Sequence, residues 1–229
     1  MPAQAPRRPG RSARERVRRL AVALSTLALA AGCGGSAKRA TPPDPGRQVL
    51  GAFLRAAASG DEAAMRKLLS PQSSRRVSDG QLARLRRRLA PMGNRYVLVV
   101  SERITDAFGV VAIVSRTGSY AAALRRVGGT WRVELGGPVR VRALGPDPGT
   151  RQRQVRQIAA AVTGATGKGY ALLWLDGLTL PAKTARLGTS LTIYANLPSR
   201  VLRGRHAVVA FASEGNQASA LAWTFVVVR

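Results

Sequence analysis

The sequence predicts an α+β region followed by an all-β sandwich, and three observations support this prediction. Apolar residues recur at helical spacing between residues 47 and 89. From residue 96 onward the spacing changes to a period of two, and helices followed by a strand meander indicate a layered α+β fold. Residues 150–229 contain short strands separated by turn residues, which is typical of a sandwich.

Turn and capping residues divide the helical region into three predicted helices. Gly60 ends the first, because glycine adopts the left-handed conformation that closes a helix. Asp61 is placed to cap the second, EAAMRKLL, by accepting a hydrogen bond from a free N–H group. Ser78 and Gln81 have the spacing of a capping box at the start of the third. The expected inward-facing residues are Val49, Leu50, Phe53, Leu54, Ala57, Met65, Leu68, Leu69, Leu82, Leu85 and Leu89.

The rest of the chain predicts strands separated by turns. The strands expected in the first region cover residues 96–105, 110–116, 119–127, 130–135 and 139–144. Those expected in the second region cover residues 170–177, 190–195, 206–213 and 220–228. Two prolines and two glycines within residues 145–149 indicate a linker. We therefore expect one domain at 47–144 and another at 150–229.

The N-terminal segment has the order of a secretory signal. Seven arginines lie within residues 1–19, and residues 20–32 carry no charge. As a helix these 13 residues would span only about 20 Å, at about 1.5 Å per residue. A bilayer core is roughly 30 Å thick, so the segment is too short for a permanent span. A basic region, a short apolar region and small residues predict a signal peptide at 1–32.

The only cysteine of the chain follows this segment. At LAAGC, residues 29–33, the sequence resembles a bacterial lipoprotein signal peptide with its lipobox. The resemblance implies that Cys33 is acylated, with palmitate among the chains, and becomes the first mature residue. An ordinary secretory signal with a chance cysteine is the alternative. Residues 33–46, rich in glycine and proline, then form a flexible tether with a reach on the order of 20 Å. We therefore expect a lipid-anchored protein on the extracytoplasmic side of the cell membrane.

The charge of the chain limits its partners. The sequence has 37 Lys and Arg residues against 11 Asp and Glu, and removal of residues 1–32 leaves a net charge of +20. Such a charge attracts polyanions without specifying one. Export favours anionic lipids or acidic wall polymers over nucleic acid, which also needs aromatic platforms or a readable basic helix. The alternative is a solvated basic surface that has no partner.

The first domain resembles the nuclear-transport-factor-2-like superfamily, which includes ketosteroid isomerase. Phe53-Leu54, the turn at residues 59–61 and the hairpin GGTWRV at 128–133 carry the resemblance. It implies a cone of three helices on a curved antiparallel sheet, with a pocket inside. Enzymes of this superfamily use Asp, His or Tyr in the cone for acid–base work.

The first domain offers few groups for such chemistry, since it contains no histidine. Glu102 and Glu134 lie on predicted strands, where a surface ion pair with an arginine competes with a catalytic role. Tyr96 and Tyr120 fit core aromatics better than acids. We therefore name no catalytic residue and expect a non-catalytic domain.

The second domain is similar to bacterial immunoglobulin-like domains of cell-surface proteins. The Asp176-Gly177 turn, the GRHAV stretch at 204–208, the Gly-Asn turn at 215–216 and WTFVV at 223–227 carry the resemblance. His206 is the only histidine, and a metal site needs three or four ligands, so no metal is expected. Asp176 is interpreted as a turn former.

Together these features predict an exported, lipid-anchored envelope protein with a binding or scaffolding role at the membrane surface. The expected partners are the membrane itself, an anionic lipid or wall polymer, and a protein that the sequence does not identify. No cofactor and no nucleic acid are expected. The alternative is a small-molecule enzyme or carrier that uses the cone pocket of the first domain.

Overall fold

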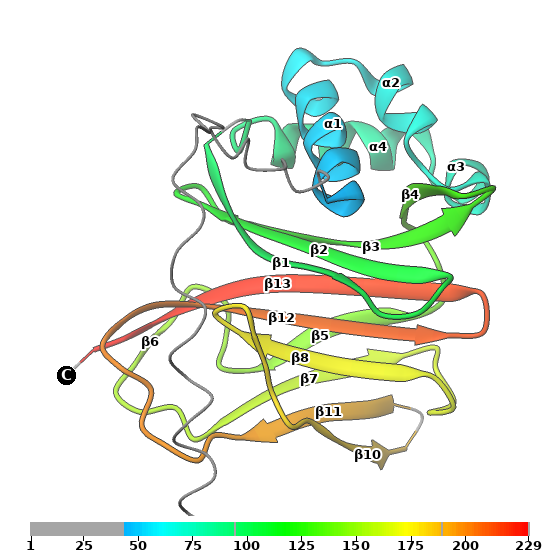
Figure 1. Ribbon diagram of the computed structural model, residues 1–229. Helices are drawn as coiled ribbons and strands as arrows, with labels where there is room; N and C mark the ends of the chain where they lie inside the picture. Colours follow the sequence, from blue (N-terminus) through cyan, green and yellow to red (C-terminus); the bar gives the residue numbers. More distant parts are fainter. Residues whose placement is uncertain (1–43, 94, 189, 229) are drawn as a thin grey trace, which may run out of the picture. The chain divides into compact units, whose positions relative to one another are not determined.

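The computed structural model describes residues 44–93, 95–188 and 190–228, which form a helical layer and three β-sheets (Figure 1). The predicted signal peptide, Cys33 and the predicted tether up to residue 43 lie outside the described residues. The tether was predicted to extend to residue 46, but residues 45–46 already belong to the first helix, which Asp44 caps. In the part that is described, no helix is long and apolar enough to cross a membrane.

Four helices precede the strands, where the sequence predicted three: α1 (Pro45–Ser59), α2 (Glu62–Lys67), α3 (Pro71–Arg76) and α4 (Asp79–Leu89). The predicted caps are confirmed. Gly60 closes α1 in the left-handed conformation, with a φ of 80°. The Asp61 carboxylate accepts from the N–H group of Ala64 at 2.8 Å. Ser78 and Gln81 form the expected capping box at the start of α4.

The additional helix α3 is held by contacts distant in sequence. Its N-cap, Ser70, accepts from the N–H group of Ser73 at 3.1 Å, and its own N–H group donates to Val133. The Ser73 hydroxyl accepts from the N–H group of Leu135 at 2.7 Å. The stretch PQSSRR has no apolar periodicity, so these tertiary contacts, rather than local propensity, explain why a short helix forms here.

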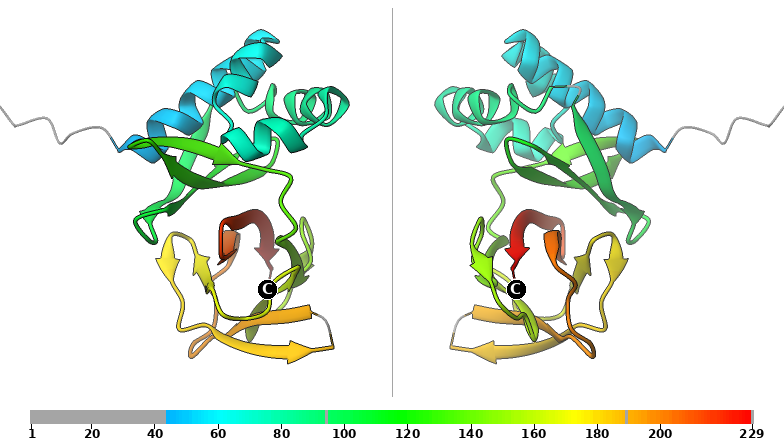
Figure 2. Two further views of the ribbon diagram at one scale, coloured as in Figure 1. Left: turned by 90° about the vertical axis from the view of Figure 1, so that its right-hand side faces the viewer. Right: turned by 90° about the vertical axis from the view of Figure 1, so that its left-hand side faces the viewer.

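The first sheet is an antiparallel meander in the order β1-β2-β3-β4. Its strands are β1 (Tyr96–Arg103), β2 (Phe108–Ser115), β3 (Ser119–Val127) and β4 (Thr130–Glu134). Gly128 and Gly129, both at positive φ, make the predicted tight turn between β3 and β4. The helices cover only one face of this sheet (Figure 2). The coarse prediction of helices followed by strands is therefore confirmed.

Two further sheets form the predicted sandwich. The middle sheet has the order β6-β13-β12-β8-β9 and the outer sheet the order β10-β11-β7-β5. The strands are β5 (Arg140–Gly145), β6 (Arg151–Gln152), β7 (Gln157–Thr163), β8 (Tyr170–Leu175), β9 (Leu178–Thr179), β10 (Lys183–Leu187), β11 (Ser190–Asn196), β12 (Gly204–Glu214) and β13 (Gln217–Val227). Ile158 and Ile193 of the outer sheet and Phe225 of the middle sheet are fully buried between them.

One strand lies in a different sheet from the one expected. Residues 139–144 were predicted as the fifth strand of the first domain, but β5 pairs with β7 in the outer sheet, with Val141 opposite Val162. The alternation of apolar residues in this strand suits either sheet, and its partner is not encoded locally. The chain therefore passes from the first sheet to the sandwich between β4 and β5, before residues 145–149.

The predicted linker is also packed rather than free. The indole N–H group of Trp223 donates to the carbonyl oxygen of Pro146 at 2.8 Å, and this bond is buried. The N–H group of Gly149 donates to the carbonyl oxygen of Thr224 at 2.7 Å. Residues 145–149 therefore lie along β13.

The first and middle sheets share a hydrophobic core. Trp174 and Phe211 of the middle sheet are fully buried against small side chains of the first sheet, among them Ala112 and Ala123. Alanines at such a contact allow two sheets to approach closely. Because β12 meets the first sheet on one face and the outer sheet on the other, its central residues are all buried.

Candidate functional site

The space between the helices and the first sheet is filled by side chains. The fully buried residues there include Leu50, Phe53, Leu54, Met65, Leu82, Leu89 and Ile113. The resemblance to a cone-shaped family implied a pocket in this position. In this chain, Leu, Phe, Met and Ile side chains occupy that interior.

The structure does not bring the expected acid–base candidates together. Tyr96 and Tyr120 pack against the helical core on one face of the first sheet. Glu102, which is exposed, turns its carboxylate to the sandwich and accepts from the indole N–H group of Trp174 at 3.0 Å. Glu134 lies directly opposite Ala123, whose side chain faces the middle sheet. Both carboxylates are therefore separated from both phenols by the sheet.

Glu134 is nevertheless the most unusual carboxylate of the first region. It is only 2 % exposed, and neither carboxylate oxygen has a hydrogen-bond partner in the described residues. Burial raises its pKa, while the nearby Ser70 hydroxyl and the charge of Arg125 partly oppose the rise. It lines a cavity of about 320 Å³ between the first and middle sheets, together with Ala218 and Ser219. The sequence indicated the strand but not this burial.

His206 has a partner that sequence reasoning missed. Its Nδ1 lies 2.7 Å from a carboxylate oxygen of Asp176, and its Nε2 lies 2.8 Å from the carbonyl oxygen of Leu202. The other Asp176 oxygen accepts from the N–H group of Ala207 at 2.8 Å. Asp176 is a turn residue as predicted, with a φ of 52°. These contacts hold the turn after β8 against the start of β12, which is a structural role.

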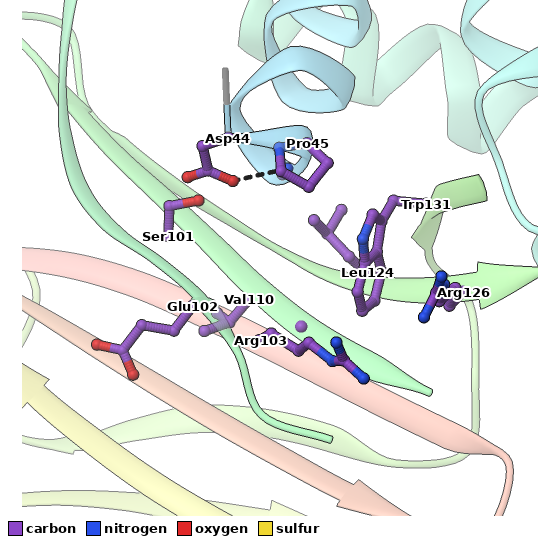
Figure 3. Close-up of a pocket in the computed structure, with 11 residues that line it drawn as sticks. Asp44, Pro45, Ser101, Glu102, Arg103, Val110, Leu124, Arg126 and Trp131 are labelled. Atoms are coloured by element: carbon purple, nitrogen blue, oxygen red, sulfur yellow. Dashed lines mark hydrogen bonds between the residues drawn. The ribbon is translucent and has the colours of Figure 1, made fainter. Parts of the chain in front are cut away.

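A cavity of about 310 Å³ opens where α1 begins (Figure 3). Leu124 and Trp131 form an apolar wall beside the first residues of the helix, and Arg103 and Arg126 lie at one end. Arg103 is paired with Asp106. The cavity is small for a ligand site, with one aromatic wall and a cationic end, and Asp44 and Glu102 also line it.

Most of the basic side chains have no acidic partner. Residues 44–228 contain 27 Lys and Arg but only 10 Asp and Glu. In the described ranges, arginine forms three ion pairs with carboxylates: Arg66–Asp79, Arg86–Glu62 and Arg103–Asp106. The outward face of α4 alone presents three exposed arginines, Arg84, Arg87 and Arg88. The surface is therefore a field of largely uncompensated positive charge, which attracts anions.

Comparison with known proteins gives only weak structural likeness. No protein-family model and no curated protein matches the sequence. An endo-β-1,4-mannanase from Thermotoga petrophila is 14% identical over 42% of this chain and 21% of its own, with a TM-score of 0.34. This chain thus spans about a fifth of that enzyme.

Two further structures are similar to the same degree. The methionine-rich copper resistance protein PcoC from Escherichia coli is 16% identical over 40% of this chain and 100% of its own, with a TM-score of 0.31. The titin Ig tandem domains A164-A165 are 8% identical over 58% of this chain and 73% of their own, with a TM-score of 0.28. Neither fold nor function of this chain follows from likeness at this level.

Metal binding has no support in the described ranges. Within them, no three His, Cys, Asp or Glu side chains gather closely enough to hold a metal ion. What the arrangement offers instead is many guanidinium groups on a rigid β scaffold. Such groups bind carboxylate and phosphate oxygens with two parallel hydrogen bonds.

Proposed function

We propose that this protein is an exported, lipid-anchored component of the cell envelope that binds anionic partners without catalysis at the membrane surface. The observation that carries this proposal is the excess of 27 basic over 10 acidic residues in the folded part, with few ion pairs among them. A charge of this size favours encounter with anionic lipids and acidic wall polymers.

The N-terminal sequence supports the proposed location. A basic segment, an uncharged stretch of 13 residues and Cys33 follow one another in the order of a lipoprotein signal. Acyl chains on Cys33 would hold the folded region within roughly 20 Å of the bilayer, through a tether that ends before α1 begins at Pro45. Anionic head groups and wall polymers are the polyanions within that reach.

The filled interior of the first region supports binding over catalysis. We propose that this region is a nuclear-transport-factor-2-like domain whose cone is closed by its own core, and that the sandwich is immunoglobulin-like. Both would serve as a rigid support for the basic surface. An acid–base site would pair a carboxylate with a phenol. The sheet separates the two kinds of group here, since Glu102 and Glu134 lie on one face and Tyr96 and Tyr120 on the other.

Co-sedimentation of the soluble chain, from Gly34 to Arg229, with purified envelope tests the proposal. We expect binding that weakens steeply as salt rises, because exposed charges are screened over about 10 Å at 0.1 M salt. Binding that is unchanged at high salt would point to a receptor recognised by apolar contacts. No binding at any salt would contradict the proposal.

A small-molecule carrier is a second candidate function, favoured by the cavity at the start of α1. Its apolar wall and the guanidinium group of Arg126 suit a small acid with a hydrophobic body. Titration of such acids against the tryptophan fluorescence of the protein tests this function, with Trp131→Phe as the control. Saturable quenching that is lost in the variant supports a carrier, and no quenching at millimolar ligand contradicts it.

A further inference from the structure

A groove lies at the end of the first sheet where β1 begins and β2 ends. It has a volume of about 790 Å³, and we call it the arginine groove. Its lining residues are Pro91, Arg95, Tyr96, Val97, Val114, Ser115, Arg116, Thr117 and Arg205. Three of the nine are arginines and none is acidic. Arg205 comes from β12 of the sandwich, so both halves of the folded region build the groove.

Two of these arginines lie at the same end of the β1–β2 ladder. Tyr96 and Ser115 are opposite each other at the end of the β1–β2 ladder. Arg95 immediately precedes Tyr96, and Arg116 immediately follows Ser115. Both positive charges therefore lie just beyond the same end of the ladder, where like charges in proximity favour the binding of an anion.

The third arginine, Arg205, lines the groove on the face of the first sheet that is turned away from the helices. Tyr96 packs on the helical side of the sheet, so Val97 faces the opposite side, because successive side chains of a strand alternate. Val97 and Val114 are opposite each other on that side, and both line the groove with Arg205. Three guanidinium groups from separate strand ends thus border one hollow.

These arginines are not engaged elsewhere in the described residues. The guanidinium groups of Arg95 and Arg116 make no hydrogen bond or ion pair there, and both residues are exposed. Arg205 makes one long contact of 3.4 Å, to the Thr224 hydroxyl. An adjoining cavity of about 290 Å³ contains Asp176, but its two oxygens are occupied by His206 and the N–H group of Ala207.

The two hydroxyl groups that line the groove are engaged within the chain. The Ser115 hydroxyl donates to the carbonyl oxygen of Gly118 at 3.2 Å and lies 3.0 Å from the Thr117 hydroxyl. A tetrahedral oxyanion takes several hydrogen bonds, and the forked donors of the three arginines are a set suited to it. Val97, 68 % exposed, offers an apolar contact beside the charged groups.

We infer that the arginine groove is a binding site for a phosphate-type anion, either a lipid head group or a soluble phosphate. The inference rests on the proposed function for its setting, since anionic partners at the envelope would supply the ligand. Arg95, Arg116 and Arg205 bind the anion through their guanidinium groups.

Calorimetric titration of the full-length chain in a neutral detergent with inorganic phosphate tests the site. The ionic strength is held constant with sodium chloride, so that screening alone produces no signal. The groove variant carries Arg95→Gln, Arg116→Gln and Arg205→Gln. The matched control carries Arg84→Gln, Arg87→Gln and Arg142→Gln, three exposed arginines on α4 and β5 with the same loss of charge.

The wild-type chain should bind phosphate at one site, with a Kd of about 1 mM or tighter. The groove variant should bind at least about tenfold more weakly, and the control should match the wild type. Phosphate should also raise the Tm of the wild type and the control but not of the groove variant. An equal loss in the control variant, or no saturation by the wild type, would overturn the inference.

The conservative change Arg116→Lys keeps the assay informative if the triple variant unfolds. It keeps the charge but loses the fork, so binding should weaken by a smaller factor than in Arg116→Gln. Equal binding by Arg116→Gln and the wild type would count against a role of Arg116.

Vesicles distinguish the two sources of phosphate. The full-length chain is mixed with phosphatidylglycerol or phosphatidylcholine vesicles, with and without inorganic phosphate. If phosphate displaces the chain from phosphatidylglycerol, the lipid head group occupies the groove. If calorimetric binding persists without such competition, the ligand is a soluble phosphate. Both results support the site.

Failure of the inference is separable from failure of the proposed function. Envelope binding that is equal in the groove and control variants would retain the proposed function and reject the groove. Phosphate binding that depends on the groove, without envelope binding, would retain the groove and reject the proposed function.

Discussion

The indole N–H group of Trp174 donates a hydrogen bond to the Glu102 carboxylate at 3.0 Å, joining β8 of the sandwich to β1 of the first sheet. A second bond, from the Ser119 hydroxyl to the carbonyl oxygen of Ala222 at 2.9 Å, joins β3 to β13 and is buried. Between them lies the core shared by the first and middle sheets. The two halves should therefore unfold as one unit.

Phe211→Ala tests this shared core. Phe211 is fully buried between the two sheets, so its truncation should destabilise the chain by about 3–5 kcal/mol. Urea unfolding followed by circular dichroism and by tryptophan fluorescence should give one coincident transition in both proteins. Val97→Ala, at an exposed position, is the control and should change stability by less than about 0.5 kcal/mol. Two separate transitions in the wild type would contradict the shared core.

Glu134→Gln should stabilise the protein at neutral pH by about 1 kcal/mol, because it removes a buried charge for which the described residues provide no hydrogen-bond partner. The raised pKa of Glu134 means that the folded state holds the proton more tightly than the unfolded state. Stability should therefore fall as pH rises from the ordinary range of glutamate through the raised pKa. Thermal unfolding across pH measures this fall, which the variant should lack.

The exposed Asp147 provides the control for that series. Asp147→Asn should leave the shape of the pH profile unchanged. A profile for Glu134→Gln that parallels the wild type would show that Glu134 does not titrate differently in the folded state.

Glu214→Gln should destabilise the loop before β8. The Glu214 carboxylate accepts from the Thr166 hydroxyl and from the N–H groups of Thr166 and Gly167, the latter at 2.9 Å. These bonds, the Thr166 hydroxyl first, lower its pKa, so the contribution to stability is present above the ordinary range of glutamate and lost as pH falls through the lowered pKa. Amide hydrogen exchange at Gly167 across pH measures it. Equal protection in variant and wild type would contradict this role.

Asp176→Ala should destabilise the protein by about 2–3 kcal/mol. The change removes the contacts with His206 and the N–H group of Ala207 and places a β-carbon at a φ of 52°. Asp176→Gly removes the same contacts, but glycine adopts a positive φ without strain, so the loss of stability should be smaller. Asp176→Asn should lose the least stability. Urea midpoints at unchanged m-value give the comparison. A variant series without this order would contradict the assigned role of the turn.

Local chemistry made the helix ends predictable. Gly60, Asp61 and the Ser78–Gln81 pair act within a few residues, and each has the predicted role. The pairing of strands was harder to predict from the sequence, because the apolar alternation of β5 fits either the first or the outer sheet. Helix α3 was missed because distant contacts stabilise it.

The candidate sites depended on contacts between distant segments. Asp176 and His206 lie 30 residues apart, and no spacing rule joins them. Arg95 precedes one predicted strand and Arg116 ends the next, so an assumed hairpin register could have brought them to the same end of the sheet. Arg205 joins them only because the sandwich packs against the first sheet, which the sequence did not indicate. The burial of Glu134 has the same cause.

The lipid anchor is the central claim, because it determines which polyanions the basic surface meets. Labelling of cells with an alkyne analogue of palmitate, followed by membrane fractionation of the wild type and Cys33→Ala, tests it directly. The wild-type chain should carry the label and remain with the membrane, and Cys33→Ala should carry none. An unlabelled wild-type chain, or equal labelling of both proteins, would contradict the account.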